Sequence, residues 1–558
     1  MMERIKHYAL WVKYYALWTP FVIIPVGLLI IRLLSKNYKF SFTQLLLLFG
    51  ASVIVSLIIF SDNYIKAKNG KKLKDMHFVD AFSSRPDKYA ITTGKREART
   101  PDVDSKLLVD GVPQGVIFGK DKVSDKYIAK LAGEEGNVLY CGGSGSGKTQ
   151  LLLNSIISML AADRTYDVAH MLIVDPKLEL TEKVVGRDIN GNWNDDGTII
   201  FDMSDRHSYG YDPLYVLNAV EHPSENQIYL EMKNIIEAIL PISQADGETA
   251  FWKSLAQSVS IGFFIYAYKR GKHTLSDIVT SFIFRPLSEV VKEVCNNSDT
   301  SSKEYKICNA YRDMPDDTIG SIQANLRALE VYALDDNVVW QLSVNPNKFS
   351  PLDLLHTNIH LCVDPKQLQA NSSIIMLIIS QTIQWMLTLE DYDRITEPRK
   401  PIYIIFEEFT SVISSMHITM PDIIVTMLQY ARSKKCYLLL ICQSLSGLLA
   451  ISNNNKDLVN SALSNFSYLC FLDCFSPDSA QMVIDYVGKY DKKNVSTTRN
   501  GNHTSTQTSF EEADILNKND LIKLAGSDEL ILISRIGGYN MIKKIAAWSD
   551  DNFSYRLH

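Results

Sequence analysis

The chain has 558 residues, of which 46% are hydrophobic, so it is long enough for several domains with ample cores. Its formal net charge of −6 excludes a protein whose whole surface is basic, although a local basic channel remains compatible with that value. The eight cysteines form no CxxC pair and no Cys/His cluster with zinc spacing, so we expect reduced, buried thiols in a cytosolic compartment.

Two uncharged apolar runs, residues 14–31 and 45–60, predict a membrane-spanning hairpin over residues 14–60. A signal peptide is the alternative for the first run, but a second span follows it and no small-residue cleavage site separates the two. Lys and Arg flank both runs, and the positive-inside rule moderately favours both ends in the cytosol. Residues 1–13 are then a short cytosolic N-terminus, and membrane lipid is a partner.

Residues 142–149 satisfy the pattern G-x-x-x-x-G-K-[ST] of phosphate-binding loops. Residues 137–141 predict a short buried strand before the loop, and residues 150–160 predict an apolar helix after it. A chance Gly/Ser-rich turn is the alternative. Backbone N–H groups would hold the phosphates, Lys148 would reach the β- and γ-phosphates, and Thr149 would ligate Mg²⁺. The predicted nucleotide-binding residues are Gly142, Gly143, Ser144, Gly145, Ser146, Gly147, Lys148 and Thr149.

This loop also fixes the orientation in the membrane, because ATP is cytosolic. The sequence therefore predicts an ATPase that uses ATP and Mg²⁺. Its bulk lies in the cytoplasm, and the hairpin anchors it to an inner or plasma membrane.

Strand and helix patterns alternate in much of the remaining chain, which predicts an α/β fold whose parallel sheet is covered on both faces. From about residue 213 to about 346 the pattern is helical, which predicts an all-α domain inserted into the α/β core. Residues 496–509 are polar and predict an exposed hairpin or loop around Asn500-Gly501. The apolar strand patterns are at residues 169–174, 198–201, 359–363, 402–406, 437–442, 468–472 and 530–533.

Two acids, Glu407 and Glu408, follow the predicted strand 402–406 and form a Walker B pattern. The first acid would hold Mg²⁺ and the second would polarise the attacking water. An aspartate is usual at the first position, so the division of roles between the two glutamates stays open. A solvated acidic strand end is the alternative interpretation.

Gln443 and Arg432 flank the predicted strand 437–442. Gln443 at its end could contact the γ-phosphate, or could be an ordinary polar residue at a strand end. Arg432 before it could reach the nucleotide of a neighbouring subunit as an arginine finger, or could cap a helix. Asp175, Lys177 and Glu179 follow another strand and could face the nucleotide or a subunit interface.

With these features the chain resembles the type IV secretion coupling proteins, the TraG/TrwB-like conjugation ATPases, which are related to the FtsK/HerA motors. The resemblance covers most of the chain and depends on the order and spacing of its motifs. These are the membrane hairpin, the phosphate loop, DPKLEL at 175–180, DPLYVLN at 212–218, Phe251-Trp252, IIFEEF at 404–409, ARSKKCYLLLICQSLSGL at 431–448 and the run 515–532.

The resemblance implies a RecA-like nucleotide-binding domain, formed by residues 61–212 and 350–558, with an all-α domain inserted at 213–349. It implies a homohexamer on the cytosolic face of a bacterial membrane. The partners would be inner-membrane components of the secretion channel and either a relaxase–DNA complex or protein effectors. Lys148, Thr149, Glu407, Glu408, Gln443 and Arg432 occupy the family's functional positions. Leu178 stands where the family usually has Gly, and Glu407 replaces Asp.

Three functions are compatible with these features. The first is a substrate receptor and DNA translocation motor of a conjugation system, and the second is a docking receptor for protein effectors. The third is an FtsK-like membrane-anchored DNA pump that is not tied to secretion. The helical insertion and the lack of a separate C-terminal winged-helix-like DNA reader in the sequence argue against the third function.

Overall fold

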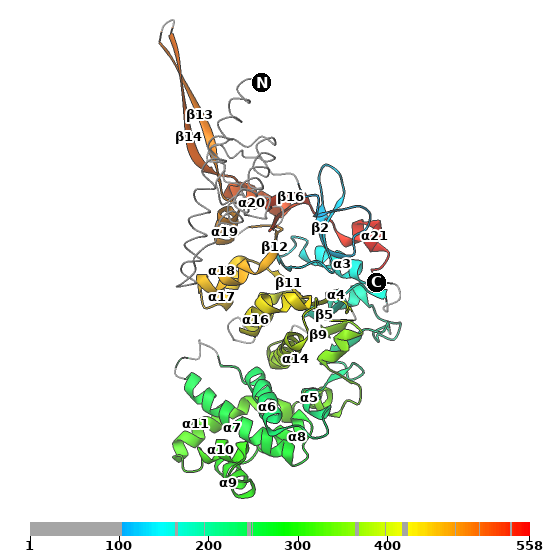
Figure 1. Ribbon diagram of the computed structural model, residues 1–558, viewed down its shortest axis with the longest axis vertical. Helices are drawn as coiled ribbons and strands as arrows, with labels where there is room; N and C mark the ends of the chain where they lie inside the picture. The colour runs from blue at the N-terminus through cyan, green and yellow to red at the C-terminus, as the bar shows by residue number, and fades with distance from the viewer. Residues whose placement is uncertain are drawn as a thin grey trace, which may run out of the picture. The chain divides into compact units, whose positions relative to one another are not determined.

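The computed structural model describes residues 103–557 except 162–165, 195, 243–246, 248, 363–367, 397, 416–421, 475, 501–502 and 536–537. Two compact units are distinguished, and each is described by itself. One contains the β-hairpin of β13 (Lys489–Asn500) and β14 (His503–Asp514), so of the two alternatives expected for residues 496–509, a hairpin or a loop, the structure has the hairpin. The other, within residues 99–488 and 514–558, holds the main sheet and its helices (Figure 1).

Within the described ranges, no helix combines the length and the apolar character needed to cross a bilayer. The predicted spans at residues 14–31 and 45–60 lie outside the described residues.

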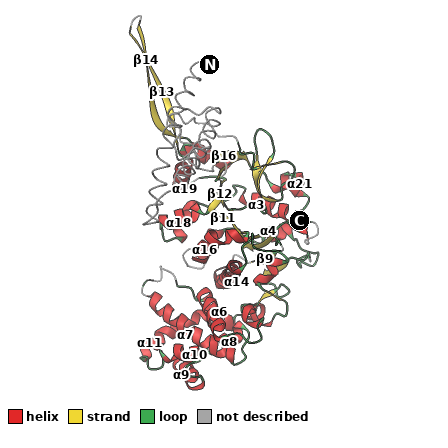
Figure 2. Ribbon diagram, viewed as in Figure 1, coloured by secondary structure: helices red, strands yellow, loops and turns green. Residues whose placement is uncertain are grey.

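The second unit is built on one mixed twelve-stranded sheet (Figure 2). Its parallel part confirms the predicted α/β class and has the order β12 (Phe466–Phe471), β4 (Asn137–Cys141), β11 (Cys436–Cys442), β10 (Ile402–Phe406), β5 (His170–Asp175), β9 (Ile359–Cys362) and β6 (Ile199–Asp202). The carboxyl ends of these parallel strands meet at one edge, where ligands of such folds bind.

An antiparallel part extends the sheet beyond β12. It consists of β15 (Glu529–Ser534), β16 (Gly538–Lys543), β2 (Gly115–Lys120), β3 (Tyr127–Leu131) and β1 (Leu108–Val109). The sequence predicted short strands in a lead-in over residues 75–135 and β15 as the closing strand, but it predicted neither β16 nor the pairing of these strands with the main sheet. Pairing between strands more than 400 residues apart, such as β2 and β16, leaves no local signal in the sequence.

Both faces of the sheet are buried, since successive residues of the central strands enter different cores. In β10, Ile404 and Phe406 join one core, whereas Tyr403 and Ile405 join the other. The helices of the Tyr403 side are α3 (Lys148–Met159), α4 (Glu179–Val184) and α21 (Asp551–Ser554). Those of the other side are α14 (Leu368–Thr388), α15 (Phe409–Ser415), α16 (Asp422–Tyr430), α17 (Leu445–Ile451), α18 (Lys456–Ser464), α19 (Pro477–Val487) and α20 (Lys518–Lys523).

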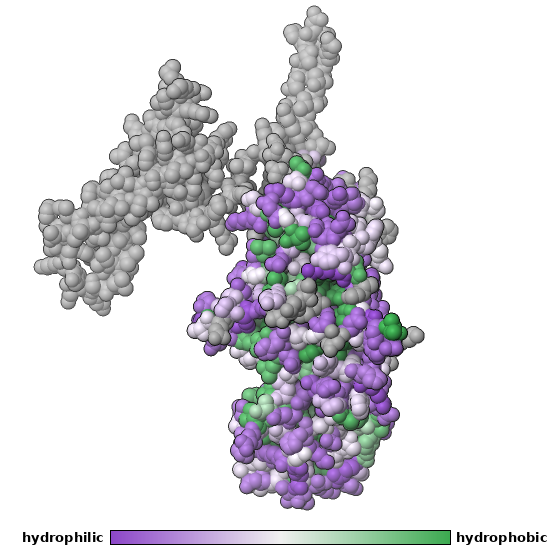
Figure 3. Space-filling view, turned by 90° about the vertical axis from the view of Figure 1, so that its right-hand side faces the viewer, coloured by the Kyte–Doolittle hydropathy of each residue, from purple (hydrophilic) through white to green (hydrophobic). Residues whose placement is uncertain are grey.

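The stretch predicted to be all-helical forms a helical insertion between β7 (Gly210–Tyr211) and β8 (Lys348–Phe349), whose parallel pairing brings its two ends together. Its core is continuous with that of α14, on which α6 packs. Figure 3 shows one face of the protein, and the described residues on this face are mostly hydrophilic, with scattered apolar patches. The helices are α5 (Tyr215–Asn218), α6 (Glu225–Ile239), α7 (Thr249–Lys269), α8 (Leu275–Thr280), α9 (Leu287–Asn297), α10 (Lys303–Asn309), α11 (Asp316–Leu326), α12 (Val331–Leu334) and α13 (Asp336–Val339).

Candidate functional site

The predicted phosphate loop connects β4 to α3, as its sequence context requires. Gly145 and Gly147 have φ values of 78° and 98°, in the left-handed region that glycine adopts without strain. The Lys148 side chain folds back, and its Nζ donates to the carbonyl oxygen of Gly143 at 2.6 Å. Burial lowers the pKa of Lys148, against the opposing effect of Glu408 and Asp473. The loop thus has the backbone geometry of an anion cradle, with its lysine turned back onto the loop backbone.

The predicted metal ligands, Thr149 and Glu407, contact each other. The Thr149 hydroxyl donates to Oε1 of Glu407 at 3.1 Å, which joins the start of α3 to the end of β10. Oε2 of Glu407 is buried and accepts no hydrogen bond from an N–H or hydroxyl group in the described part of the chain, and the Asp175 carboxyl is close enough to share a proton with Glu407. Burial and the neighbouring Asp175 carboxyl raise the pKa of Glu407 to about 8. A buried carboxyl beside another acid is a site that a cation would stabilise in its ionised form.

The second acid, Glu408, is held from two sides. Lys177 Nζ donates to its Oε1 at 2.7 Å, and Gln443 Nε2 donates to its Oε2 at 2.7 Å. Burial alone would raise the pKa of Glu408, but these two hydrogen bonds and the positive charges of Lys177 and Lys148 together outweigh it and hold the pKa below its usual range. Its φ of 61° is uncommon for a residue with a Cβ and marks a constrained backbone at the strand end.

Sheet order explains why these side chains meet. Strand β11, which ends just before Gln443, lies between β4 with its phosphate loop and β10 with its two acids, and β5 lies beyond β10. The loop after β5 provides Lys177, so four neighbouring strands deliver side chains to one edge. A fifth strand, β12, adds Asp473, whose carboxylate accepts from Gly143 N–H at 2.8 Å (Oδ1) and 2.9 Å (Oδ2).

Asp473 was not predicted from the sequence, although it follows the predicted strand 468–472 directly. An acid after a strand was the available signal, but nothing local to residue 473 showed that it would lie against the phosphate loop. A Cβ on Gly143 would come 3.2 Å from Asp473 Oδ2, so a side chain at position 143 would crowd the acid. Glu179 also follows β5, but it pairs with Lys183 at 2.5 Å and does not join these residues.

Arg432 is not brought to this edge of the sheet within the chain. It lies in the 3₁₀ turn Ala431–Lys434 before β11, whereas Gln443 follows the same strand. Its Nε donates to Oε2 of Glu135 at 2.6 Å, and both side chains are about half exposed. Arg432 and Gln443 therefore lie at opposite ends of β11, and only Gln443 lies beside the two acids.

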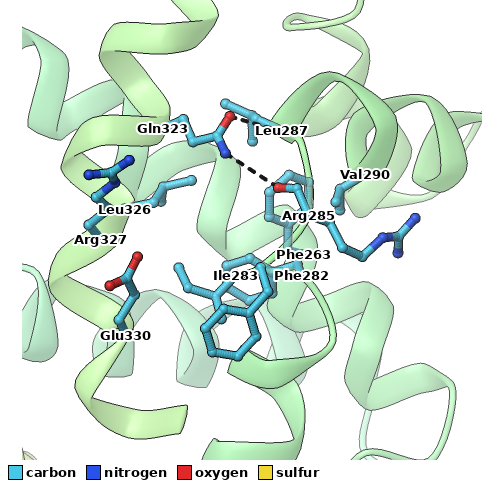
Figure 4. Close-up of a pocket in the computed structure, with 11 residues that line it drawn as sticks. Phe263, Phe282, Ile283, Arg285, Leu287, Val290, Gln323, Leu326, Arg327 and Glu330 are labelled. Carbon is cyan, nitrogen blue, oxygen red and sulfur yellow. Dashed lines mark hydrogen bonds between the residues drawn. The ribbon is translucent and has the colours of Figure 1, made fainter. Parts of the chain in front are cut away.

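A cavity lies in the helical insertion, on elements other than those that carry the phosphate loop. It has a volume of about 220 Å³, and its walls combine aromatic and aliphatic side chains with Arg285, Arg327 and Glu330 (Figure 4). Gln323 crosses one side of it, with its amide directed at the backbone of Arg285 and Leu287. The apolar lining residues are Phe263, Phe282, Ile283, Phe284, Leu287, Val290 and Leu326.

Solved structures of a known protein have the same fold as this chain over most of its length. The bacterial conjugative coupling protein TrwB, in its unbound form, is 14% identical over 82% of this chain and 97% of that chain, with a TM-score of 0.58. TrwB in complex with ADP and Mg²⁺ is 13% identical over 81% of this chain and 95% of that chain, also with a TM-score of 0.58. At such low sequence identity, these similarities show only that the folds are alike.

Among curated proteins none matches this chain. A family model described as type IV secretory system conjugative DNA transfer matches residues 87–556, which is most of the chain. The resemblance inferred from the motif order is thereby confirmed. The chain belongs to the type IV secretory system conjugative DNA transfer family.

Proposed function

We propose that this chain is a coupling ATPase of a type IV secretion or conjugation system, which recruits a substrate and uses ATP hydrolysis to drive or license its transfer. The observation that carries the proposal is the contact between Thr149 and Glu407 at 3.1 Å. It joins the two halves of a magnesium-nucleotide site that lie about 260 positions apart in the sequence. Family membership provides the context of secretion, which the FtsK-like alternative lacks.

Mg²⁺ fits the donor set at this position. The Thr149 hydroxyl and the buried, unsatisfied Oε2 of Glu407 are hard oxygen donors of the kind that Mg²⁺ prefers, and they would hold the ion. When bound, the ion would neutralise charge on the phosphate oxygens of ATP. The residues from Gly142 to Thr149 would hold the phosphates, with Lys148 released from the Gly143 carbonyl to contact them.

Glu408 is the group that we assign to the attacking water. Lys177 and Gln443 keep its carboxylate ionised and oriented, which is what a residue that accepts or polarises a water proton requires. Gln443 is also placed between the phosphate loop and the acids, so it can respond to the γ-phosphate. Arg432 lies at the other edge of the sheet, and its role would be towards the nucleotide of a neighbouring subunit.

The remaining parts of the proposal concern assembly. Residues 14–60 would anchor the chain in a bacterial inner or plasma membrane, and the ATPase would act as a homohexamer beside the inner-membrane components of the channel. The helical insertion, proposed to span residues 213–349, would receive a relaxase–DNA complex or protein effectors. Its cavity supports this assignment, because apolar side chains and charged rims can hold a segment of a partner protein.

ATPase activity of the detergent-solubilised full chain, with and without single-stranded and double-stranded DNA, tests the proposal. We expect turnover that is lost in Lys148→Ala and Glu408→Gln but kept in Glu289→Gln, at an exposed acid of α9. Stimulation by DNA would identify a DNA substrate, and turnover indifferent to DNA would favour protein effectors. Turnover that is equal in the wild type and in Glu408→Gln would contradict the assignment of the site.

A further inference from the structure

The segment after β16, residues 544–556, runs along α3, the helix that begins at the phosphate loop. We call it the C-terminal strap. Ala547 N donates to Oε1 of Gln150 at 3.1 Å, and Asn154 Nδ2 donates to the carbonyl oxygen of Ile545 at 2.9 Å. Near the other end of α3, Arg556 Nη1 donates to the carbonyl oxygen of Ile157 at 3.2 Å. These contacts fix the strap on α3 at three heights.

The first of these contacts lies at the edge of the phosphate site, because Gln150 directly follows Thr149. Ala547 is fully buried there, whereas the next residue, Trp548, exposes 69% of its surface. No hydrogen bond, ring stacking or cation–π contact involves this indole among the described residues. A single exposed aromatic residue is ordinary on protein surfaces, so its exposure alone carries no argument. Its backbone, however, is held beside the first turn of α3, because the preceding residue, Ala547, is hydrogen-bonded to Gln150.

Sheet order gives the direction in which a bound nucleotide must point. The two acids directly follow β10 and Gln443 directly follows β11, and both strands lie on one side of β4. The γ-phosphate has to face them, since the attacking water enters at that phosphate. The nucleoside end then points to the opposite side of β4, where the sheet continues through β12 and β15 to β16. The strap follows β16, so it approaches the phosphate site from the nucleoside side.

We propose that Trp548 stacks on the nucleobase of the nucleotide bound at the phosphate loop. The inference depends on the proposed function, because it assumes that ATP binds there. An indole face is a good stacking platform for a purine, and a base stacked on an aromatic side chain gains affinity without base-edge hydrogen bonds. The hydroxyl of Ser549, the next residue, donates to Ala546 within the strap. Because that hydroxyl is already bonded, the group that the strap presents to a base is the exposed indole ring of Trp548.

The test compares two ligands that differ in the base. Binding of ATP and of inorganic tripolyphosphate to the full-length protein is measured in the same Mg²⁺ buffer. We expect Trp548→Ala to weaken ATP binding roughly tenfold, as base stacking predicts, and to leave tripolyphosphate binding within about twofold. Trp548→Phe should restore most of the ATP affinity. Tyr555→Ala is the matched control, since Tyr555 is an equally exposed aromatic residue of the strap next to Arg556.

Other outcomes overturn the inference. Equal weakening of ATP and tripolyphosphate would mean that the substitution damages the phosphate loop, and unchanged ATP binding would mean that the base lies elsewhere. If light scattering shows that the oligomer of Trp548→Ala dissociates, and ATP affinity falls with it, Trp548 would be assigned to a subunit contact. A wild-type protein that binds neither ligand would instead contradict the proposed function. If Trp548→Ala fails to fold, quenching of indole fluorescence by ATP but not tripolyphosphate, absent in Trp548→Phe, decides the question.

Discussion

Lys177 Nζ lies 2.7 Å from Oε1 of Glu408, and this ion pair connects the loop after β5 to the end of β10. The carboxylate is almost fully buried, while nearly half of the lysine side chain is exposed. On the other side of the same carboxylate, Gln443 donates from the end of β11. Glu408 is therefore held by residues that follow two different strands, β5 and β11, and Lys177 is one of the groups that fix the position of its carboxylate.

Removing this lysine should impair turnover more than binding. In Lys177→Met the Glu408 carboxylate loses its charged partner, and we expect kcat to fall roughly tenfold, as for other groups that orient a reacting side chain. The KM for ATP should change little, because Lys177 is assigned no contact with the phosphates. Lys177→Arg should recover much of the activity. A rise in KM with an unchanged kcat would place Lys177 at the nucleotide instead.

Asp473 should stabilise the phosphate loop in the absence of nucleotide. Asp473→Ala removes a charge-assisted acceptor and leaves the Gly143 N–H without its partner, at a cost of about 1–3 kcal/mol. Thermal unfolding of the nucleotide-free protein should therefore begin at a lower temperature. Asp528→Ala, at an exposed acid next to β15, is the control. Equal stability of Asp473→Ala and the wild type would show that the contact contributes nothing net.

At position 178 we expect a glycine variant to be more stable than an alanine variant, which is the reverse of the usual order in a helix or turn with ordinary backbone angles. The φ of Leu178, 62°, lies in the left-handed region, which costs a residue with a Cβ about 1–2 kcal/mol. Both Leu178→Ala and Leu178→Gly lose the same packing, but only the glycine relieves the strain. We expect Leu178→Gly to be more stable than Leu178→Ala by about 1 kcal/mol in thermal unfolding.

At Glu182, inside α4, the same pair of substitutions should show the ordinary order, with Ala the more stable by about 1 kcal/mol. A glycine penalty at position 178 as large as that at 182 would refute the strain argument.

Lys130 predicts a pH dependence of stability. Its amino group is fully buried, donates to the Tyr403 hydroxyl at 2.7 Å and lies 4.2 Å from the centre of the Tyr437 ring. Burial lowers its pKa to about 7, from 10.5. Between these values the unfolded chain binds a proton that the folded chain does not, so stability rises with pH across this window, by about 1.4 kcal/mol per pH unit.

Unfolding temperatures of the wild type and of Lys130→Met, compared from pH 7 to pH 10, check this expectation. The wild type should gain stability relative to Lys130→Met as the pH rises. Lys126→Met, at a more exposed lysine just before the same strand, is the control. A constant difference between wild type and Lys130→Met over this range would mean that Lys130 keeps its proton in the folded state.

Local patterns were sufficient for the parallel half of the fold and for most of the candidate site. The loop 142–149 was recognisable because its glycines and its flanking strand and helix follow one another in the chain. The acids at 407 and 408 were recognisable because they follow directly after a run of apolar residues. Each of these signals is local, so the sequence contains it in full.

By itself, then, the sequence determined the family, the α/β class and the identity of the loop and acids, because those depend on residues close together in the chain. Only the tertiary structure decided which side chains meet. It placed Asp473 on Gly143, Lys177 on Glu408 and the strap on α3. These relationships follow from strand order and from pairings across hundreds of residues, which no local pattern encodes.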